Sequence, residues 1–269
     1  MKPRSVTAEY EIKSNKLKKP VTVGLISDLH ERDADDIFAL LKGAEPDLIA
    51  VAGDSFERYS GKYLEARRRQ NPVKSACFVA AYHIDRAIRF IFRVNNSPLP
   101  ENSYRFLRRS ARLAPVFLSL GNHEEELLGE DTDFFAANGI TLLDNSSVKT
   151  VVNGQELIIG GLSTEYDEDL PERLSRENGF KIMLCHHPEY YERLLKDKDI
   201  DLILSGHNHG GQFRIFGKGL LSSSTGLFPK YDRGLFDGRL VVSAGCANTT
   251  AIPRFFNPRE AVIIRLLPD

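Results

Sequence analysis

Residues that can bind metal ions gather in five short motifs of this 269-residue chain. Only seven histidines occur in the chain, and six of them lie in these motifs. The motifs are Asp28-Leu29-His30, Gly53-Asp54, Gly121-Asn122-His123-Glu124, His186-His187-Pro188 and Gly206-His207-Asn208-His209. Carboxylate and amide oxygens mixed with imidazole nitrogens suit Mn²⁺, Fe or Zn²⁺ better than Ca²⁺ or a thiolate-bound metal. The motifs therefore predict a site for divalent metal ions.

Each motif alone also has a structural explanation. An Asp after a Gly, as at Asp54, is typical of a turn or a helix cap. His186 alone is compatible with a histidine that bonds to the backbone at a helix start. The segment around His207 and His209 is harder to explain structurally, because its glycines ease the approach of a ligand but contribute no packing. Together, the motifs favour metal binding.

Each motif directly follows a short apolar run. Runs of four to seven residues that end in Gly or Asp predict buried strands at 21–27, 47–52, 116–120, 182–185 and 202–205. Further strands are predicted at 6–12, 140–144, 147–152, 155–161, 239–244 and 261–266, and helices at 33–43, 73–94, 102–113, 131–138 and 188–197. This alternation predicts an α/β or α+β fold with helices covering sheets. The motifs then share the carboxyl ends of strands, where such sheets place their sites.

Composition excludes several other classes of protein. The chain is 42% hydrophobic and 27% charged, which is ordinary for one large globular domain or two small ones. Its three cysteines, without Cys-x-x-Cys spacing, argue against a disulfide framework and fit a reducing compartment. No apolar run of 18 residues predicts a transmembrane helix. We expect a cytoplasmic protein as written, or a membrane-associated one if an upstream anchor is missing.

The ordered set of motifs resembles the calcineurin-like metallophosphoesterase superfamily over roughly residues 20–266. Gly210-Gly211-Gln212 and the tail at 253–258 are similar to a bacterial branch. That branch includes membrane- or cell-wall-associated phosphodiesterases and UDP-diacylglucosamine hydrolases. The resemblance implies one domain over 1–269 with a four-layer α/β/β/α sandwich. It also implies that a hydroxide bridging two metal ions attacks a phosphodiester or pyrophosphate bond.

The resemblance also implies which residues form the site. Asp28, His30 and His209 would hold one divalent ion, Asn122, His186 and His207 the other, and Asp54 would bridge both. The expected pair is Mn²⁺, with Fe or Zn²⁺ as alternatives. His186 is favoured over His187 because the family has His-x-Pro. His123 would be no ligand but the general acid beside the phosphate, a role that suits the pKa of an imidazole.

Glu57 and Arg58 match a further motif. In related phosphoprotein phosphatases the stretch reads Gly-Asp-x-x-Asp-Arg, in which the acid orients the catalytic histidine and the arginine contacts phosphate. Here Glu57 replaces Asp and is one methylene longer. The alternative is a solvated charge pair. Arg254 lies in the tail, which should pack near the site; a surface position is the favoured interpretation and a phosphate contact is the alternative.

A basic segment separates the second and third motifs. Residues 57–112 hold 13 Arg or Lys against 4 Asp or Glu, a local net charge of +9. Asp54 and Asn122 are 68 positions apart, and many members of the superfamily need about half of that, so the resemblance implies that residues 60–105 form an inserted, helical cap. The favoured interpretation is a core-facing helix with a basic solvated face. The alternatives are a cap for anionic substrate or lipid headgroups and, least favoured, a nucleic-acid surface.

A phosphodiesterase or pyrophosphatase is the favoured activity, and two alternatives stay open. The Gly-Asp-x-x-acid-Arg match favours a phosphomonoesterase, including a protein phosphatase, whereas the Gly-Gly-Gln branch favours a phosphodiesterase acting on a phosphate-ester substrate. A non-catalytic binding scaffold is disfavoured, because all seven ligand positions and His123 are present.

Overall fold

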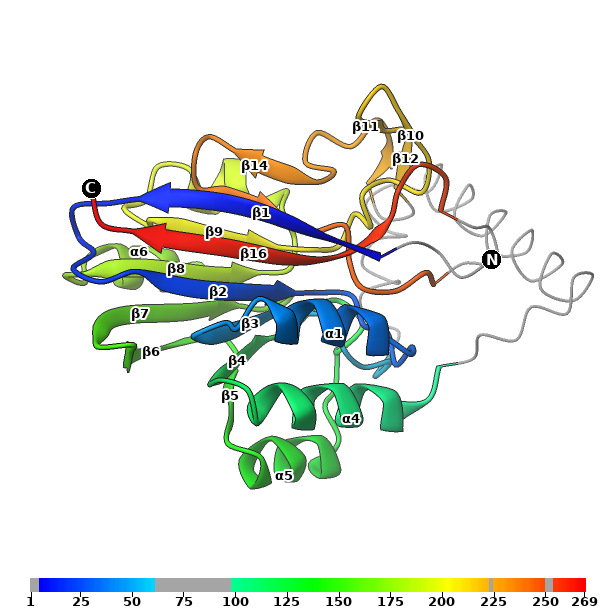
Figure 1. The fold of residues 1–269 in the computed structure, drawn as a ribbon, viewed down its shortest axis with the longest axis horizontal. Coiled ribbons are helices and arrows are strands. Elements are labelled where there is room, and N and C mark those ends of the chain that lie inside the picture. The colour runs from blue at the N-terminus through cyan, green and yellow to red at the C-terminus, as the bar shows by residue number, and fades with distance from the viewer. Residues whose placement is uncertain (1–4, 61–97, 223–224, 250–253) are drawn as a thin grey trace, which may run out of the picture.

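Two six-stranded sheets form the centre of the molecule (Figure 1). The structure is a computed structural model that describes residues 5–60, 98–222, 225–249 and 254–269. The first sheet runs in the order β1 (Ser5–Lys13), β16 (Arg259–Leu267), β2 (Val21–Ile26), β3 (Leu48–Ala52), β4 (Val116–Ser119) and β5 (Ile140–Leu143). The second runs in the order β14 (Gly234–Phe236), β15 (Leu240–Val242), β9 (Leu202–Ser205), β8 (Phe180–Cys185), β7 (Gln155–Leu162) and β6 (Ser146–Val152).

Side-chain alternation explains how the first sheet is buried on both faces. Along β3, Leu48, Ala50 and Ala52 point into the core shared with the second sheet. Ile49 and Val51 point the other way, into the core beneath the helices. Successive strand residues face opposite sides of a sheet, so a continuous apolar run such as β3 suits a strand covered on both faces.

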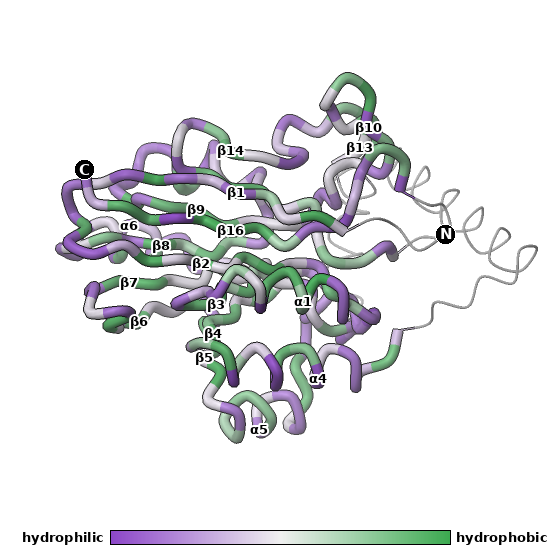
Figure 2. The backbone as a smooth tube through the Cα atoms, viewed as in Figure 1, coloured by the Kyte–Doolittle hydropathy of each residue, from purple (hydrophilic) through white to green (hydrophobic). Residues whose placement is uncertain are grey.

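Helices cover the outer face of each sheet. The first sheet packs against α1 (Asp35–Gly43), α4 (Pro100–Ala111) and α5 (Gly129–Ala137), and the second against α6 (Leu170–Ser175) and the π-helical turn η1 (Tyr191–Leu195). On α1, Ile37 and Leu41 are four residues apart and both buried, as an amphipathic helix requires. Figure 2 shows hydrophobic residues along α1 and β16. The predicted four-layer sandwich is confirmed.

The secondary-structure predictions largely hold. Every predicted strand occurs, and so do three of the predicted helices, as α1, α4 and α5. The predicted helix at 188–197 is reduced to the five-residue turn η1, and α6 was not predicted. The predicted helix at 73–94 lies outside the described residues.

The predicted cap at 60–105 lies mostly outside the described residues, which resume at residue 98. Its last residues begin α4, a helix whose Phe106 and Leu107 are buried against the first sheet. The inserted cap therefore stays a prediction for 61–97, whereas 100–105 belong to a helix of the main sandwich.

Two small hairpins project from one end of the sandwich. β10 (Arg214–Ile215) pairs with β11 (Lys218–Gly219), and β12 (Leu221–Ser222) pairs with β13 (Gly226–Leu227), both antiparallel. Figure 1 shows these hairpins at the end of the molecule at which β2 ends. Among the helices of the described residues, none is long and apolar enough to cross a membrane.

Candidate metal centre

The five motifs meet where the two sheets end. Their residues follow β2, β3 and β4 of the first sheet and β8 and β9 of the second. These strands are parallel within each sheet, so their carboxyl ends share one edge. The two sheets are joined there by a hydrogen bond, because the backbone N–H of His207 donates to Asp28 Oδ1 at 3.1 Å. Segments 179 residues apart in sequence thus contribute to one site.

Asp28, His30 and His209 form the first group of possible ligands. One ligand atom from each lies within 4.8 Å of the others. The distance to Asp28 Oδ1 is 3.6 Å from His209 Nε2 and 3.9 Å from His30 Nε2. Burial lowers the pKa of His209 to about 3. Its ring is therefore neutral near neutral pH, as metal coordination requires.

Asp54, His186 and His207 form the second group, again with ligand atoms within 4.8 Å. His186 Nε2 lies 3.0 Å from Asp54 Oδ2 and 3.2 Å from His207 Nδ1. The other ring nitrogen of His186, Nδ1, lies 2.7 Å from the carbonyl oxygen of Ala52, to which it donates. This hydrogen bond places a proton on Nδ1 and directs Nε2 toward Asp54. Burial lowers the pKa of His186, but Asp54 outweighs burial and raises it to about 10.

Asp54 also reaches the first group. Its Oδ2 atom lies 3.7 Å from His30 Nε2 and 3.0 Å from His186 Nε2. Its other oxygen, Oδ1, accepts the backbone N–H of His123 at 3.0 Å. Burial raises the pKa of Asp54, but the neighbouring rings of His123 and His186 outweigh burial, so the pKa is held well below its usual value. The carboxylate is therefore ionised between the two groups.

Two buried polar atoms at the site have no hydrogen-bond partner among the described residues. They are His30 Nε2 and Asn122 Oδ1. Burying such an atom without a partner is costly, and native proteins rarely do so unless an ion or water satisfies it. The donors present, imidazole nitrogens with carboxylate and amide oxygens, fit divalent first-row transition metals. The residues present therefore fit a metal centre.

Five of the seven predicted ligands have a left-handed backbone. They are Asp28 (φ 55°), His30 (φ 48°), Asp54 (φ 55°), His207 (φ 74°) and His209 (φ 48°). Residues other than glycine seldom adopt this conformation, and when they do they cluster at functional sites. The surrounding structure must hold these turns in place, since the local backbone preference opposes them.

Glycine is required where two loops approach each other. A Cβ atom on Gly121 would lie 2.1 Å from Asp54 Oδ1, and one on Gly206 would lie 2.5 Å from Asp28 Oδ2. Both distances are too short for any real side chain. The glycines of these motifs therefore allow the carboxylates to sit against the neighbouring backbone.

Glu124 organises the loop that carries Asp54. Its buried carboxylate accepts the backbone N–H groups of Asp54, Ser55, Phe56 and Gly121 at 2.6–3.0 Å. Burial and the nearby Asp54 raise the pKa of Glu124, against the effect of these hydrogen bonds. Sequence reasoning included Glu124 in a motif but gave it no role. Its place directly after His123 was the only signal.

Glu57 joins two of the site histidines. Glu57 Oε2 lies 3.0 Å from His123 Nδ1, and Oε1 lies 3.0 Å from His30 Nδ1. The longer side chain of Glu57 therefore reaches the histidine, and it is not a solvated charge. Burial raises the pKa of Glu57, but the two rings outweigh burial and lower it. Burial lowers the pKa of His123, but Asp54 and Glu57 outweigh burial and raise it.

Arg58 points away from the metal ligands. Its guanidinium donates to Asp131 at 2.8 and 2.9 Å and to Glu31 at 2.7 Å, and the side chain is buried. The solvated charge pair is therefore not what the structure contains. The predicted contact of Arg58 with phosphate stays a prediction, and these ion pairs favour a structural role.

Arg254 and Glu189 also lie at the site. Arg254 was expected at the surface, which is wrong: it is buried, and its Nη2 lies 3.2 Å from His209 Nδ1. Arg254 Nη1 donates to Ala244 O, in the loop after β15, at 2.6 Å. Glu189 Oε1 lies 3.7 Å from His207 Nε2 and 3.3 Å from His187 Nδ1. Arg254 is buried by contacts with segments far away in sequence, which leave no local signal, whereas Glu189 is partly exposed and lies two residues from His187.

The fold and the site together define a class of protein, a layered α/β sandwich with buried carboxylate, amide and imidazole groups at the carboxyl ends of its strands. The model of the calcineurin-like phosphoesterase family matches residues 21–211, and the chain belongs to this family. Hydrolysis of phosphoesters with divalent metals is the chemistry of that family, and the resemblance found in the motifs is confirmed.

Three relatives illustrate the breadth of the family. The chain is 30% identical over 220 residues to the uncharacterized protein YpbG of Bacillus subtilis, covering 79% of this chain and 70% of that protein. It is 29% identical over 281 residues to the UDP-2,3-diacylglucosamine pyrophosphatase LpxG of Chlamydia muridarum, covering 90% and 82%. It is 33% identical over 113 residues to the phosphodiesterase YaeI of Escherichia coli, covering 39% and 40%.

Proposed function

We propose that the chain is a binuclear metal-dependent phosphoesterase that hydrolyses a phosphodiester or pyrophosphate bond. The observation that carries this proposal is the position of Asp54, whose Oδ2 lies within 4 Å of a histidine from each ligand group. A carboxylate shared by two ligand groups is what a two-metal phosphoesterase site needs.

The two groups and Asn122 would hold two divalent ions, with Mn²⁺ expected and Fe or Zn²⁺ as alternatives. When bound, such ions supply Lewis acidity toward the phosphate oxygens and lower the pKa of a bound water. The chain itself holds the ligands in place. Glu57 accepts from His30 Nδ1, and Nε2 of that ring faces Asp28 and Asp54.

His123 would protonate the leaving oxygen. Because the Glu57 carboxylate can only accept, His123 Nδ1 is the donor in their 3.0 Å contact. The raised pKa of His123 supports a ring that also carries a proton on Nε2 near neutral pH. Nε2 lies 3.7 Å from Asp54 Oδ2, beside both ligand groups. A group in this place and protonation state suits a general acid.

The names of two relatives support a diester or pyrophosphate substrate. LpxG is named as a pyrophosphatase of a nucleotide-linked diacyl sugar, and YaeI as a phosphodiesterase. A phosphomonoesterase, including a protein phosphatase, is the second candidate, and the contact between Glu57 and His123 is the observation that favours it. Contact of the basic insert at 60–105 with an anionic membrane stays a prediction, and nucleic acid is not an expected partner.

The test is metal analysis of the purified chain, followed by rates on bis- and mono-p-nitrophenyl phosphate with Mn²⁺. We expect two metal ions per chain, a faster rate on the diester, and loss of both metal and turnover in Asp54→Asn. A faster rate on the monoester would instead support the phosphomonoesterase. Bound metal without hydrolysis of either compound, or of a panel of nucleotide, lipid and sugar phosphodiesters, would support a binding scaffold.

A further inference from the structure

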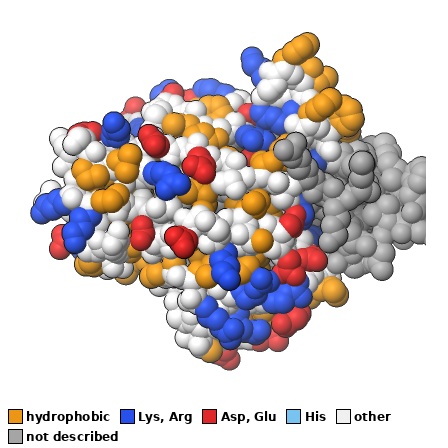
Figure 3. Space-filling view, in the orientation of Figure 1, with side chains coloured by type: hydrophobic (Ala, Val, Ile, Leu, Met, Phe, Trp, Pro, Cys, Tyr) orange, Lys and Arg blue, Asp and Glu red, His pale blue; other side chains and the backbone are white. Residues whose placement is uncertain are grey.

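Exposed apolar side chains gather beside the metal centre. Thirteen large apolar side chains are exposed among the described residues, and seven of them lie in one small region. The seven are Ile215, Phe216, Leu221, Leu227, Phe228, Phe255 and Phe256. We call residues 212–222, 225–228 and 254–256 the apolar lobe. Figure 3 shows apolar side chains projecting there, next to basic ones. An apolar patch of this kind on a protein surface marks an interaction site.

The apolar lobe is a built structure. Backbone hydrogen bonds link its segments side by side: Arg214 N–H donates to Phe255 O at 3.0 Å, and Leu220 N–H donates to Phe213 O at 2.7 Å. A further bond runs from Phe228 N–H to Leu220 O at 2.9 Å. The exposed side chains are therefore carried on a hydrogen-bonded framework.

Three phenylalanines of the lobe have left-handed backbones. Phe216, Phe228 and Phe256 have φ angles of 49°, 52° and 51°, and Phe216 is fully exposed while Phe256 is 76% exposed. Bulky residues rarely adopt this conformation, and such strain clusters where structure serves function. Asn or Gly would fit these turns better and would avoid exposing an aromatic ring. Stability of the isolated chain therefore does not explain these residues.

The charge of the lobe is positive. No Asp or Glu occurs in residues 206–231 or 244–258, although the chain has 37 acidic residues. The lobe contains Arg214, Lys218 and Arg254. Lys218 is exposed, two residues after Phe216 across the hairpin turn. Exposed aromatic and aliphatic side chains next to lysine suit the interface of an anionic bilayer, where apolar groups enter the acyl boundary and cations meet the headgroups.

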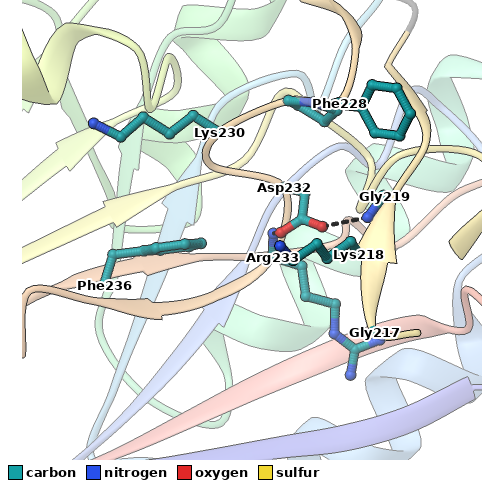
Figure 4. Close-up of a pocket in the computed structure, with 9 residues that line it drawn as sticks. Gly217, Lys218, Gly219, Phe228, Lys230, Asp232, Arg233 and Phe236 are labelled. Carbon is teal, nitrogen blue, oxygen red and sulfur yellow. Dashed lines mark hydrogen bonds between the residues drawn. The ribbon is translucent and has the colours of Figure 1, made fainter. Parts of the chain in front are cut away.

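A cavity of about 600 Å³ lies between residues 217–219 of the lobe and residues 228–236 (Figure 4). Lys218, Lys230 and Arg233 line it together with the rings of Phe228 and Phe236. Asp232 also lines the cavity, and its carboxylate accepts the Gly219 N–H at 2.6 Å and pairs with Arg214 at 3.0 Å. Lys230 and Arg233 also pair with glutamates of neighbouring strands and turns. The cavity thus offers cationic side chains beside the apolar ones.

The lobe is joined directly to the metal centre. Arg254 Nη2 lies 3.2 Å from His209 Nδ1, and Arg214 Nη1 donates to Gly210 O at 2.8 Å. Asn257 Nδ2, just after the lobe, donates to His209 O at 2.7 Å. A partner that binds the lobe would therefore lie close to the loop after β9, which carries His209.

We propose that the apolar lobe docks the chain on an anionic lipid bilayer, with Phe216 and Phe256 entering the interface and Lys218 facing the headgroups. A bilayer fits better than a second copy or another protein, because the apolar groups project from separate turns and the lobe has no acidic residue. The docking rests on the lobe alone. Its consequence, that the site acts on phosphoesters held at a membrane surface, rests on the proposed function.

The test is co-sedimentation of the full chain with vesicles of phosphatidylcholine alone or of equimolar phosphatidylcholine and phosphatidylglycerol. We expect binding to the anionic vesicles that weakens with added salt. The double variant Phe216→Asn with Phe256→Asn should lower the bound-to-free ratio about tenfold or more, because two aromatic rings no longer enter the bilayer. Asn accepts a left-handed backbone, so the double variant should fold. Lys218→Glu should weaken binding to anionic vesicles only.

Val151→Thr is the matched control, since Val151 is exposed on β6, at the opposite edge of the second sheet from β14. It should bind like the unchanged chain. Absence of binding, or equal binding by the double variant, would overturn the proposal, and the latter would direct attention to residues 60–105. Loss of a dimer in the double variant, measured by sedimentation equilibrium, would assign the lobe to a second copy instead.

A second assay separates this proposal from the proposed function. Hydrolysis of water-soluble bis-p-nitrophenyl phosphate should be the same in the double variant and the unchanged chain. If no variant hydrolyses it but the lobe still binds vesicles, the proposed function fails and the docking stands. If hydrolysis proceeds but vesicles are not bound, the docking fails alone.

Discussion

The Glu57 carboxylate lies 3.0 Å from Nδ1 of His123 and, through its other oxygen, 3.0 Å from Nδ1 of His30. One side chain therefore holds the proposed general acid and a predicted metal ligand in fixed orientations. Carboxylates that accept from histidines in this way fix the tautomer of the ring and raise its basicity.

Replacing Glu57 by Gln should lower kcat by about 10- to 100-fold, as is typical when such an outer partner is lost. The carboxylate also raises the pKa of His123. Without it that pKa falls, the ring loses its acidic proton at a lower pH, and the alkaline limb of the pH–rate profile should move to lower pH. The measurement is kcat against pH with Mn²⁺. An unchanged profile together with reduced activity would assign Glu57 a purely structural role.

His123→Ala should retain metal but lose turnover by about 10²- to 10⁴-fold, the contribution typical of a general acid. The loss should be larger for an alkyl phosphodiester than for bis-p-nitrophenyl phosphate, because p-nitrophenolate leaves without a proton. Rates on both compounds and the metal content of the variant check this. Equal losses on the two leaving groups would contradict proton donation by His123, and unchanged turnover would remove the residue from the mechanism.

Gly121→Ala should disrupt the metal centre. Its Cβ would lie 2.1 Å from Asp54 Oδ1 and would push the shared carboxylate out of place. We expect reduced metal content and lower thermal stability. Gly129→Ala is the matched control, because nothing lies within 4 Å of the added Cβ at the start of α5 and alanine favours a helix. Metal analysis and melting curves of both variants give the comparison; similar metal loss in the two would contradict the steric argument.

The buried pair of Arg58 and Asp131 should make stability fall in acid. Burial raises the pKa of Asp131, but hydrogen bonds from Arg58 and Tyr104 outweigh burial and lower it. The pKa of Asp131 in the folded chain lies below the ordinary value of 3.8. The ion pair with Arg58 therefore stabilises the fold fully at pH values above 3.8, and this stabilisation disappears as the pH falls through the pKa of Asp131 in the folded chain.

Asp131→Asn should therefore lower the free energy of unfolding near neutral pH by about 3 kcal/mol, the cost typical of breaking a buried ion pair. Its stability should also fall less on acidification than that of the unchanged chain. Urea unfolding at several pH values measures both effects. Asp167→Asn, which removes an exposed pair with Arg173, is the control and should change little. Equal pH dependence of stability in the two variants would contradict the role of the Arg58–Asp131 pair in acid sensitivity.

The sequence by itself determined the strands and the positions of the residues that can bind metal ions, and its resemblance to the family implied the sandwich. Strands such as β3 are recognisable because a strand that is buried on both faces appears in the sequence as a local apolar run. The motifs are recognisable because each ligand cluster spans a few neighbouring residues after a strand. The family resemblance depends on that same local order, so the chain could be assigned to phosphoester hydrolysis before its structure was known.

Only the tertiary structure decided which side chains meet. Arg58 could be a phosphate contact or a solvated charge from sequence, but packing places it on Asp131, 73 residues away. Arg254 is buried against His209 by a chain segment that returns 45 residues later. The apolar lobe likewise depends on a pairing of Phe213 with Phe255. Partners of this kind are selected by the packing of distant segments, and no local preference records them.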